Sequence, residues 1–405
     1  MDAMQNNRKI FNDPVYGFVS VPHGLLLNLV DHPYFQRLRR IRQVGLAHFV
    51  YPGALHTRFH HALGALHLMQ QAVDVLRHKG AEITAAEAEA VSAAILLHDI
   101  GHGPYSHALE HTIVDLHHER LSLLFMEEMN RQFDGQLSLA IQIFSDQYPK
   151  KFLHQLVSSQ LDMDRLDYLN RDSFFTGVSE GVIGYDRIIK MLAVHNGELV
   201  VEEKGIYSIE KFLIARRLMY WQVYLHKTNV AAEQMVIHLL RRARELALGN
   251  VQLEASRHLH WFLYRDTKEQ PSVTVMLDHF AQLDDVDIAA AIKAWRNADD
   301  PVLSLLATGL LDRKLFRLEW RSVPVEADYV EKIRTKVSHM FGPDISTEHL
   351  VFTGSESNQA YDISVEKINI LFKDGRVLPI DECSDVPLYT QVVTKHFICY
   401  PKEIQ

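Results

Sequence analysis

The residue pair His98-Asp99 closes an apolar segment in the sequence LLHDIGHGPYSHALEH, and Gly101 follows two residues later. Neighbouring side chains on a helix point about 100° apart, so they converge on one ion only when that ion lies beyond the helix end. An imidazole nitrogen and a carboxylate oxygen are ligands that suit a borderline divalent metal ion. The pair therefore predicts a metal-binding site, although a single His-Asp pair also occurs often by chance.

Two further segments carry side chains of the same kind. Upstream, the sequence HTRFHHALG places His61 on an expected helix. Downstream, the segment SSQLDMDRLDYLNRD holds the acidic residues Asp162, Asp164, Asp167 and Asp172. A carboxylate in an otherwise apolar helical run is costly to bury unless a cation or a hydrogen-bond donor compensates for it. We expect Asp164 to be compensated in this way and Asp167 to lie on a solvated helix face.

Helices must position these side chains. Apolar residues at three- and four-residue spacing predict helices over 25–30, 35–44 and 58–79. Thr84-Ala-Ala-Glu87 is a capping box that opens a helix running to His98. After the break at residues 101–104, further helices are expected from Tyr105, over 119–132, through Tyr168, and over 209–248, 289–296 and 303–306.

The two ends of the chain have β character. Residues 9–21 are expected to be extended, with a turn at Asn12-Asp13-Pro14. Near the C-terminus, one more helix over 325–340 precedes β-rich segments at 350–353, 363–372, 376–380 and 396–400. Lys373-Asp374-Gly375 is a hairpin signal between two of these segments. We predict a mainly α protein, with a helical catalytic domain over 1–325 and a small α+β region over 326–405.

The composition excludes several classes of protein. With 405 residues, 47% of them apolar, the chain can bury a sizeable core. Its net charge of −9 argues against binding nucleic acid by bulk electrostatics, although the basic segment 6–42 would suit a small polyanion. Cys383 and Cys399 are expected to be thiols in a reducing cytoplasm. Neither a secretion signal nor a membrane span is expected, so we predict a cytoplasmic protein.

The order of the motifs resembles that of a known family. The set His61, His98-Asp99 and Asp164 is similar to the ligand set of the HD superfamily of metal-dependent phosphohydrolases. The segments KIFNDPVYG, DHPYFQRLRRIRQVG, YPGALHTRFHHALG, LLHDIGHGPYSHALEH, DMDRLDYLNRDSFFTGV and YLHK resemble one branch, the deoxynucleoside triphosphate triphosphohydrolases. The resemblance covers residues 9–317 and implies an HD-domain helical core, which the small C-terminal α+β appendage predicted from the residues would follow.

This resemblance implies hydrolysis of a dNTP to a deoxynucleoside and inorganic triphosphate, with water attacking the α-phosphorus. It assigns the metal ligands to His61, His98, Asp99 and Asp164, which tolerate Fe, Mn, Zn, Ni or Mg, and Mg would accompany the nucleotide. The residues that match catalytic positions are His102, His107, Glu110 and His118. The residues that match substrate-binding positions are Gln43, Val44, Arg58, Asp162, Arg165, Tyr168, Asp172, Arg216 and Tyr224.

Each of these assignments has a plainer alternative. His102 can be a turn residue in Gly-His-Gly, and Arg165 can form a surface salt bridge. The resemblance also implies homodimers or homotetramers with an activator site for GTP or a dNTP between subunits. The residues that resemble that site are Lys9, Asp31, Gln36, Arg39 and Arg313. The alternative is that these residues only pack a dimer.

Two other functions stay open at this point. Another HD enzyme, such as a phosphodiesterase or a 5′-nucleotidase, would share the four ligands but not the set of Gln43, Asp172 and Tyr224. A non-catalytic HD protein could sense nucleotides or bind nucleic acid. The complete ligand set argues against that second alternative.

Overall fold

The structure is a computed structural model that describes residues 8–106, 112, 114, 116–265, 272–359, 361–362, 364, 366–388 and 391–404. The antiparallel hairpin of β1 (Arg8–Asp13) and β2 (Gly17–Pro22) precedes the helices. The Asp13 carboxylate closes its turn by accepting hydrogen bonds from the backbone amides of Val15 (2.9 Å) and Tyr16 (3.0 Å). The extended segment and the turn predicted here are therefore confirmed.

The part of the chain that follows is helical, and its longest helix is α3 (Arg58–His78). The others in this part are α1 (Leu25–Asp31), α2 (Pro33–Gln36), α4 (Ala85–Leu97), α5 (His118–Gln132), α6 (Ser138–Phe144), α7 (Lys151–Val157), α8 (Met163–Thr176) and α9 (Tyr185–Met191). Both α4 and α8 contact α3. A Cβ atom at Gly64 of α3 would lie 2.0 Å from the Asp167 carboxylate on α8, so glycine permits this close approach.

Several predicted helices are confirmed, and two predictions in this part are wrong. The capping box of Thr84 and Glu87 opens α4, with both reciprocal hydrogen bonds present. The helix expected over 35–44 gives way to a 3-10 turn at Arg37–Arg40 and then to extended backbone. No helix begins at Tyr105, because Tyr105 and Ser106 have φ angles of 51° and 60°. Residues 107–111 lie outside the described part of the chain.

The long helix expected over 209–248 is interrupted. Helix α10 (Ile206–Met219) continues into a π-helical segment, Tyr220–Tyr224, and the chain bends before α11 (Lys227–Leu248). The His226 side chain caps α11 by accepting from the Thr228 amide at 3.2 Å. Further helices are α12 (Arg257–Tyr264), α13 (Val273–Phe280), α14 (Asp285–Trp295) and α15 (Pro301–Leu311).

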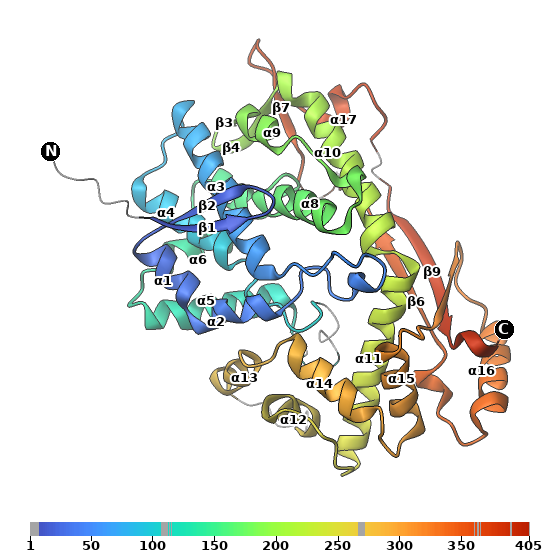
Figure 1. Cartoon of the computed structure of the whole chain (residues 1–405). Coiled ribbons are helices and arrows are strands. Elements are labelled where there is room, and N and C mark those ends of the chain that lie inside the picture. The colour runs from blue at the N-terminus through green and yellow to red at the C-terminus, as the bar shows by residue number, and fades with distance from the viewer. Residues whose placement is uncertain are drawn as a thin grey trace.

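The C-terminal segment joins two sheets (Figure 1). Strands β5 (Arg317–Arg321), β9 (Val393–Tyr400) and β6 (Phe352–Asn358) form one antiparallel sheet, flanked by α16 (Ala327–Phe341). Strands β7 (Asn369–Leu371) and β8 (Val377–Pro379), with α17 (Ile380–Cys383) after them, extend the hairpin of β3 (Leu192–His195) and β4 (Glu198–Glu202). The hairpin at residues 373–375 is confirmed. The mainly α class is confirmed, while the boundary at residue 325 stays a prediction.

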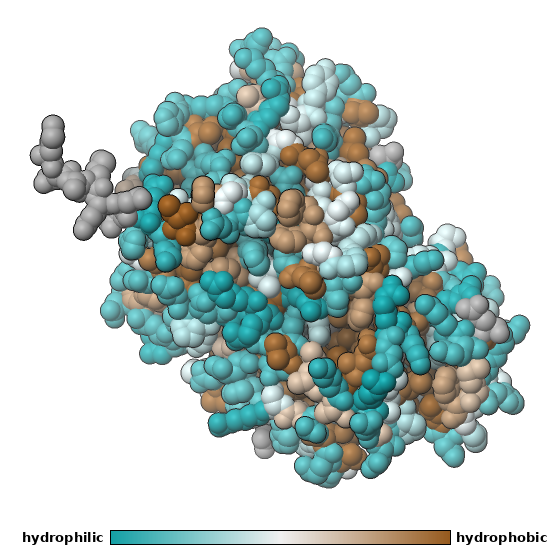
Figure 2. Space-filling view, in the orientation of Figure 1, coloured by the Kyte–Doolittle hydropathy of each residue, from teal (hydrophilic) through white to brown (hydrophobic). Residues whose placement is uncertain are grey.

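In Figure 1, α10 and α11 run between the helices around α3 and the C-terminal strands β6 and β9. On the face drawn in Figure 2, apolar side chains lie in separate groups among hydrophilic ones. Within the described residues, no helix combines the length and the apolar character needed to cross a membrane. Strands β6 and β9 thus lie on the other side of α10 and α11 from the helices around α3, whereas β7 and β8 extend the β3–β4 sheet.

Candidate metal centre and adjoining cavity

Three helices bring the predicted metal ligands together. His61 lies in the first turn of α3, His98 and Asp99 follow the last residue of α4, and Asp164 lies in the first turn of α8. Asp164 Oδ1 is 3.0 Å from His61 Nε2 and 3.4 Å from His98 Nε2, and these two nitrogens are 3.3 Å apart. The Asp99 oxygens lie 3.5 Å from His98 Nε2 and 3.7 Å from His61 Nε2. These four residues are called the metal-ligand cluster below.

The spacing of these atoms fits a divalent ion. With metal–ligand bonds of about 2.1 Å, ligand atoms at octahedral or tetrahedral angles are roughly 3.0 to 3.4 Å apart. Burial disfavours a charged His61, but hydrogen bonds to Asp164 and Asp167 outweigh burial and raise its pKa to about 10. The carboxylates that favour positive charge on His61 would also favour a metal cation, which would take the place of the proton.

A second layer of contacts orients the two imidazoles. His61 Nδ1 donates to Asp167 Oδ2 at 2.7 Å, and His98 Nδ1 donates to the Ile95 carbonyl at 2.6 Å. Both contacts direct Nε2 toward the cluster. Asp167 is fully buried and also pairs with Arg171, so the expectation of a solvated face is wrong. The four-residue spacing from Asp167 to Arg171 was the signal for a compensated buried carboxylate.

A cavity of about 700 Å³ opens beside the cluster. On the metal side it is lined by Arg58, Asp99, His102, His118, Glu119 and Asp164. Arg58 donates to Asp99 and, at 2.7 Å, to Ser106. His102 Nε2 lies 3.3 Å from Asp99 Oδ1, and the His102 and His118 rings stack with centroids 4.0 Å apart. Burial and the charge of Arg58 hold the pKa of His102 well below its usual range, so its imidazole is neutral.

The turn after the cluster lets α5 reach the cavity. A Cβ atom at Gly101 would lie 2.3 Å from the His118 carbonyl oxygen and 2.3 Å from the Ser122 amide nitrogen. The Gly101 amide also donates to Ser122 Oγ at 2.9 Å. Glycine is therefore required where the chain passes the start of α5. The predicted catalytic residues His107 and Glu110 lie outside the described residues.

The other end of the cavity is lined by predicted substrate residues, Gln43, Val44, Tyr168, Asp172 and Tyr224. Asp172 is held from two sides: His56 Nε2 donates to Oδ1 and the Tyr224 hydroxyl donates to Oδ2, both at 2.7 Å. Gln43 Oε1 is buried, and no hydrogen-bond partner for it exists among the described residues. His56 escaped prediction from the sequence, because only the fold brings it to Asp172. We call this end the Asp172 end.

The remaining substrate residues are placed differently. Arg165 lines the cavity, and its Nε donates to the Ser159 carbonyl at 2.6 Å and to Asp162 at 3.1 Å. Asp162 and Arg216 are not among the residues that line the cavity. Asp162 instead caps α8, and Arg216 donates to Gln160 Oε1 at 3.2 Å.

Sequence reasoning missed several cavity residues. Those on α11 include Asn229, Glu233, Gln234 and Ile237, and Glu356 lies on β6. The spacing of Asn229, Glu233 and Ile237 places them on one helix face, a signal that could have been used. Glu356 arrives from the C-terminal sheet, and nothing in its local sequence indicates this.

Of the five residues predicted to form the activator site, only some lie close to one another. Arg39 Nε donates to Gln36 Oε1 at 2.8 Å and lies 3.6 Å above the Phe59 ring. Arg313 instead donates to the Phe49 carbonyl. Lys9 lies on β1, and Asp31 is the last residue of α1. Among the described contacts, none joins Arg313 to the other four.

Comparison with known proteins places the chain in a family. The family model described as the HD associated region matches residues 183–261. The crystal structure of a phosphohydrolase from Bacteroides thetaiotaomicron has a TM-score of 0.93 and 54% identity, covering 97% of this chain and 99% of that one. The Bacillus subtilis protein YwfO is 31% identical, over 98% of this chain and 93% of its own length.

A further relative is the Dictyostelium discoideum homologue of the deoxynucleoside triphosphate triphosphohydrolase SAMHD1. It is 31% identical over 62% of this chain, and the match spans 52% of that relative. The chain therefore belongs to the HD-domain phosphohydrolase family, as its motifs predicted. It is a hydrolase of a metal-dependent class, and its described residues include a cluster suited to the metal.

Proposed function

We propose that the protein hydrolyses deoxynucleoside triphosphates to deoxynucleosides and inorganic triphosphate. The observation that carries this proposal is that Asp99 and Asp164 of the metal-ligand cluster line the same cavity of about 700 Å³ as the Asp172 end. A cavity of this size suits a small-molecule ligand. The deoxynucleoside triphosphate triphosphohydrolase activity for which the Dictyostelium relative is named supports the proposal.

Phosphate chemistry belongs at the metal side of the cavity. A divalent ion bound there supplies Lewis acidity at a phosphoryl oxygen and a bound water of lowered pKa. Arg58 and Arg165 offer planar guanidinium groups to the phosphate oxygens. Water attacks the α-phosphorus, the bond to the 5′ oxygen breaks, and that oxygen takes up a proton. His102, held neutral by burial, and the stacked His118 are the described imidazoles that can move protons. His107 and Glu110 stay predicted for this role.

Sugar recognition belongs at the Asp172 end. The contacts from His56 and Tyr224 fix the Asp172 carboxylate, which can accept a hydrogen bond from a 3′-hydroxyl. The buried Gln43 Oε1 is an acceptor of the same kind. Burial and the nearby Asp172 charge raise the pKa of Tyr224 well above its usual range, so its hydroxyl stays protonated and donates. The Tyr224 ring would then lie where a 2′-hydroxyl would clash.

Product analysis tests this function directly. The purified protein is incubated with each dNTP, each ribonucleoside triphosphate and each nucleoside monophosphate, with Mg²⁺ or Mn²⁺. We expect inorganic triphosphate and a deoxynucleoside from the dNTPs. Release of single phosphates, or activity confined to monophosphates or cyclic nucleotides, would contradict the proposal and favour another HD phosphohydrolase.

The predicted activator site is a separate part of the proposal. GTP or a dNTP would bind between subunits of a homodimer or homotetramer and raise turnover. Gel filtration and rate measurements with and without added GTP test this. An unchanged oligomer size and an unchanged turnover rate would contradict the proposed activator site but would leave the hydrolysis proposal intact.

A further inference from the structure

The loop between α7 and α8 connects the C-terminal segment to the cavity. Gln160 in this loop is buried, and its side-chain amide donates to the carbonyls of Asp362 (2.5 Å) and Glu366 (3.2 Å). Its Oε1 accepts from Arg216 Nη1 on α10 at 3.2 Å. One side chain thus contacts the C-terminal segment on one side and Arg216, a predicted substrate-binding residue, on the other.

The orientation of the Gln160 amide is fixed by its partners. Carbonyl oxygens accept hydrogen bonds only, so the NH₂ group of Gln160 must face Asp362 and Glu366. Its oxygen is then turned toward Arg216. The long arginine side chain has many rotamers, and a buried acceptor in a fixed position selects among them. The position of the guanidinium therefore depends on where the C-terminal segment lies.

The same loop holds the other cation near the phosphate side. Arg165 donates to the Ser159 carbonyl and lines the cavity. The Arg216 guanidinium lies 5.9 Å from the ring centroid of Tyr220, which also lines the cavity. Arg216 thus lies immediately behind the cavity wall.

We propose that Gln160 is a positioning residue through which the C-terminal segment sets the place of Arg216 for the triphosphate. This inference rests on the proposed function, because it assumes a triphosphate substrate. Asp362 and Glu366, although far from the HD motifs in sequence, would then tune substrate binding. Arg216 would contact the phosphates, whereas Gln160 would act only through Arg216.

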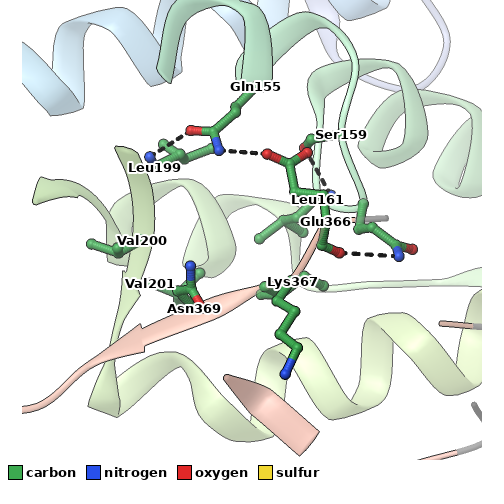
Figure 3. A pocket seen from close by; sticks show the side chains of 11 residues that line it. Gln155, Ser159, Leu161, Leu199, Val200, Val201, Glu366, Lys367 and Asn369 are labelled. Atoms are coloured by element: carbon green, nitrogen blue, oxygen red, sulfur yellow. Dashed lines mark hydrogen bonds between the residues drawn. The ribbon is translucent and has the colours of Figure 1, made fainter. Parts of the chain in front are cut away.

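A neighbouring glutamine provides a matched control. Gln155 on α7 is also buried; its Oε1 accepts from the Leu199 amide at 2.7 Å, and its Nε2 donates to Glu366 at 2.5 Å. Figure 3 shows Gln155 between Leu199 and Glu366. Gln155 therefore attaches the same C-terminal segment, and its described hydrogen bonds do not include Arg216.

The experiment compares Gln160→Met, Gln155→Met, Arg216→Met and the double variant Gln160→Met/Arg216→Met in the full chain. Methionine keeps the side-chain length and removes both hydrogen-bonding groups. For each protein, KM and kcat for a dNTP, the Kd for inorganic tripolyphosphate by calorimetry, and Tm are measured. We expect Gln160→Met to raise KM and Kd about tenfold, the effect of losing a hydrogen bond to a charged group, with less change in kcat.

Gln155→Met is expected to lower Tm to a similar extent while leaving KM and Kd within about twofold, since only its structural contacts are lost. The double variant is expected to bind tripolyphosphate no more weakly than Arg216→Met, because Gln160 acts through Arg216. Equal effects of the two glutamine variants, or additive losses in the double variant, would overturn the inference. So would a wild-type protein that does not bind tripolyphosphate. A wild type that binds tripolyphosphate but hydrolyses no dNTP would overturn the proposed function alone.

Discussion

The metal-ligand cluster and the Asp172 end adjoin the same cavity but are assembled differently. The cluster draws its side chains from α3, α4 and α8, and a second contact fixes each of its imidazoles. The Asp172 end combines a loop residue, Gln43, with α8 and with the π-helical segment that carries Tyr224. Ligands on packed helices are held rigidly. We therefore expect substitutions at the Asp172 end, which includes a loop and a π-helical segment, to reduce turnover less than substitutions in the metal-ligand cluster.

Helix α8 connects the two ends. Asp164 contributes to the cluster, Tyr168 lines the middle of the cavity, and Asp172 marks the other end. Residues spaced by four lie on one face of a helix, and eight residues span about 12 Å. The same helix therefore sets the distance between the metal and the Asp172 end. Substitutions at each end test whether metal binding and sugar selectivity can be changed independently of each other.

The largest effect is expected for Asp164→Ala. Asp164 Oδ1 contacts both His61 and His98, so its loss removes a ligand from the centre of the cluster. We expect the bound metal to fall below one equivalent and turnover to drop by at least about 10³-fold. Metal content by mass spectrometry, turnover and Tm are measured, with Asp74→Ala on the exposed face of α3 as control. Full metal content in Asp164→Ala would contradict the ligand assignment.

Asp167→Asn tests whether the hydrogen bond from His61 to Asp167 strengthens metal binding by the cluster. It weakens the contact that orients His61, and we expect metal affinity to fall about 10- to 100-fold, as for other partners of ligating histidines. Asp13→Asn is the matched control, because Asp13 is the other carboxylate on Arg171. That control should lower Tm without changing metal affinity. Equal metal affinities in the two variants would mean that Asp167 only balances the charge of Arg171.

The four residues of the metal-ligand cluster can be predicted from the sequence more readily than the residues that surround them. His98-Asp99, the capping box and the glycines belong to continuous motifs, and local geometry determines what they do. The support by Asp167 depends on α3 packing against α8, which the sequence does not display. His56 and Glu356 reach the cavity only through tertiary contacts, from residues distant in the sequence.

One structural feature was missed although its signal is present. Asn196-Gly197 joins β3 and β4, and both residues have positive φ angles, 51° and 82°. Asn-Gly between apolar residues is a strong hairpin signal. Recognising it would have predicted the hairpin to which β7 adds in parallel. The parallel pairing itself joins segments about 170 residues apart and could not be predicted locally.

At the Asp172 end, Tyr224→Ala is expected to change selectivity rather than abolish turnover. Removing the ring opens space beside the sugar, and we expect the preference for dNTPs over ribonucleotides to fall about tenfold. Tyr224→Phe keeps the ring but loses the hydrogen bond to Asp172. It should weaken binding of both sugars while preserving the preference. Competition between a dNTP and its ribonucleotide measures this, and an unchanged preference in Tyr224→Ala would reject the role of the ring.

The smallest effect is expected for Glu87→Gln, which alters neither end of the cavity. Burial alone would raise the pKa of Glu87, but hydrogen bonds from Tyr148, Lys150 and Thr84 lower it to about 2. Because this folded-state pKa lies below the unfolded value of about 4.3, the ionised carboxylate stabilises the fold above that pH. This stabilisation is lost as pH falls from about 4.3 toward 2.

At neutral pH we expect Glu87→Gln to reduce the free energy of unfolding by roughly 2 kcal/mol, the value of a buried charge-assisted contact. Metal affinity and KM should be unchanged, because α4 keeps its packing against α3 and carries His98 as before. The difference in Tm between wild type and variant is measured from pH 7 to pH 2 and should shrink below pH 4.3. A constant difference would mean that Glu87 contributes by packing and not by charge. A loss of metal affinity would mean that the cluster depends on the start of α4, thirteen residues away, and is held less rigidly than its position between packed helices implies.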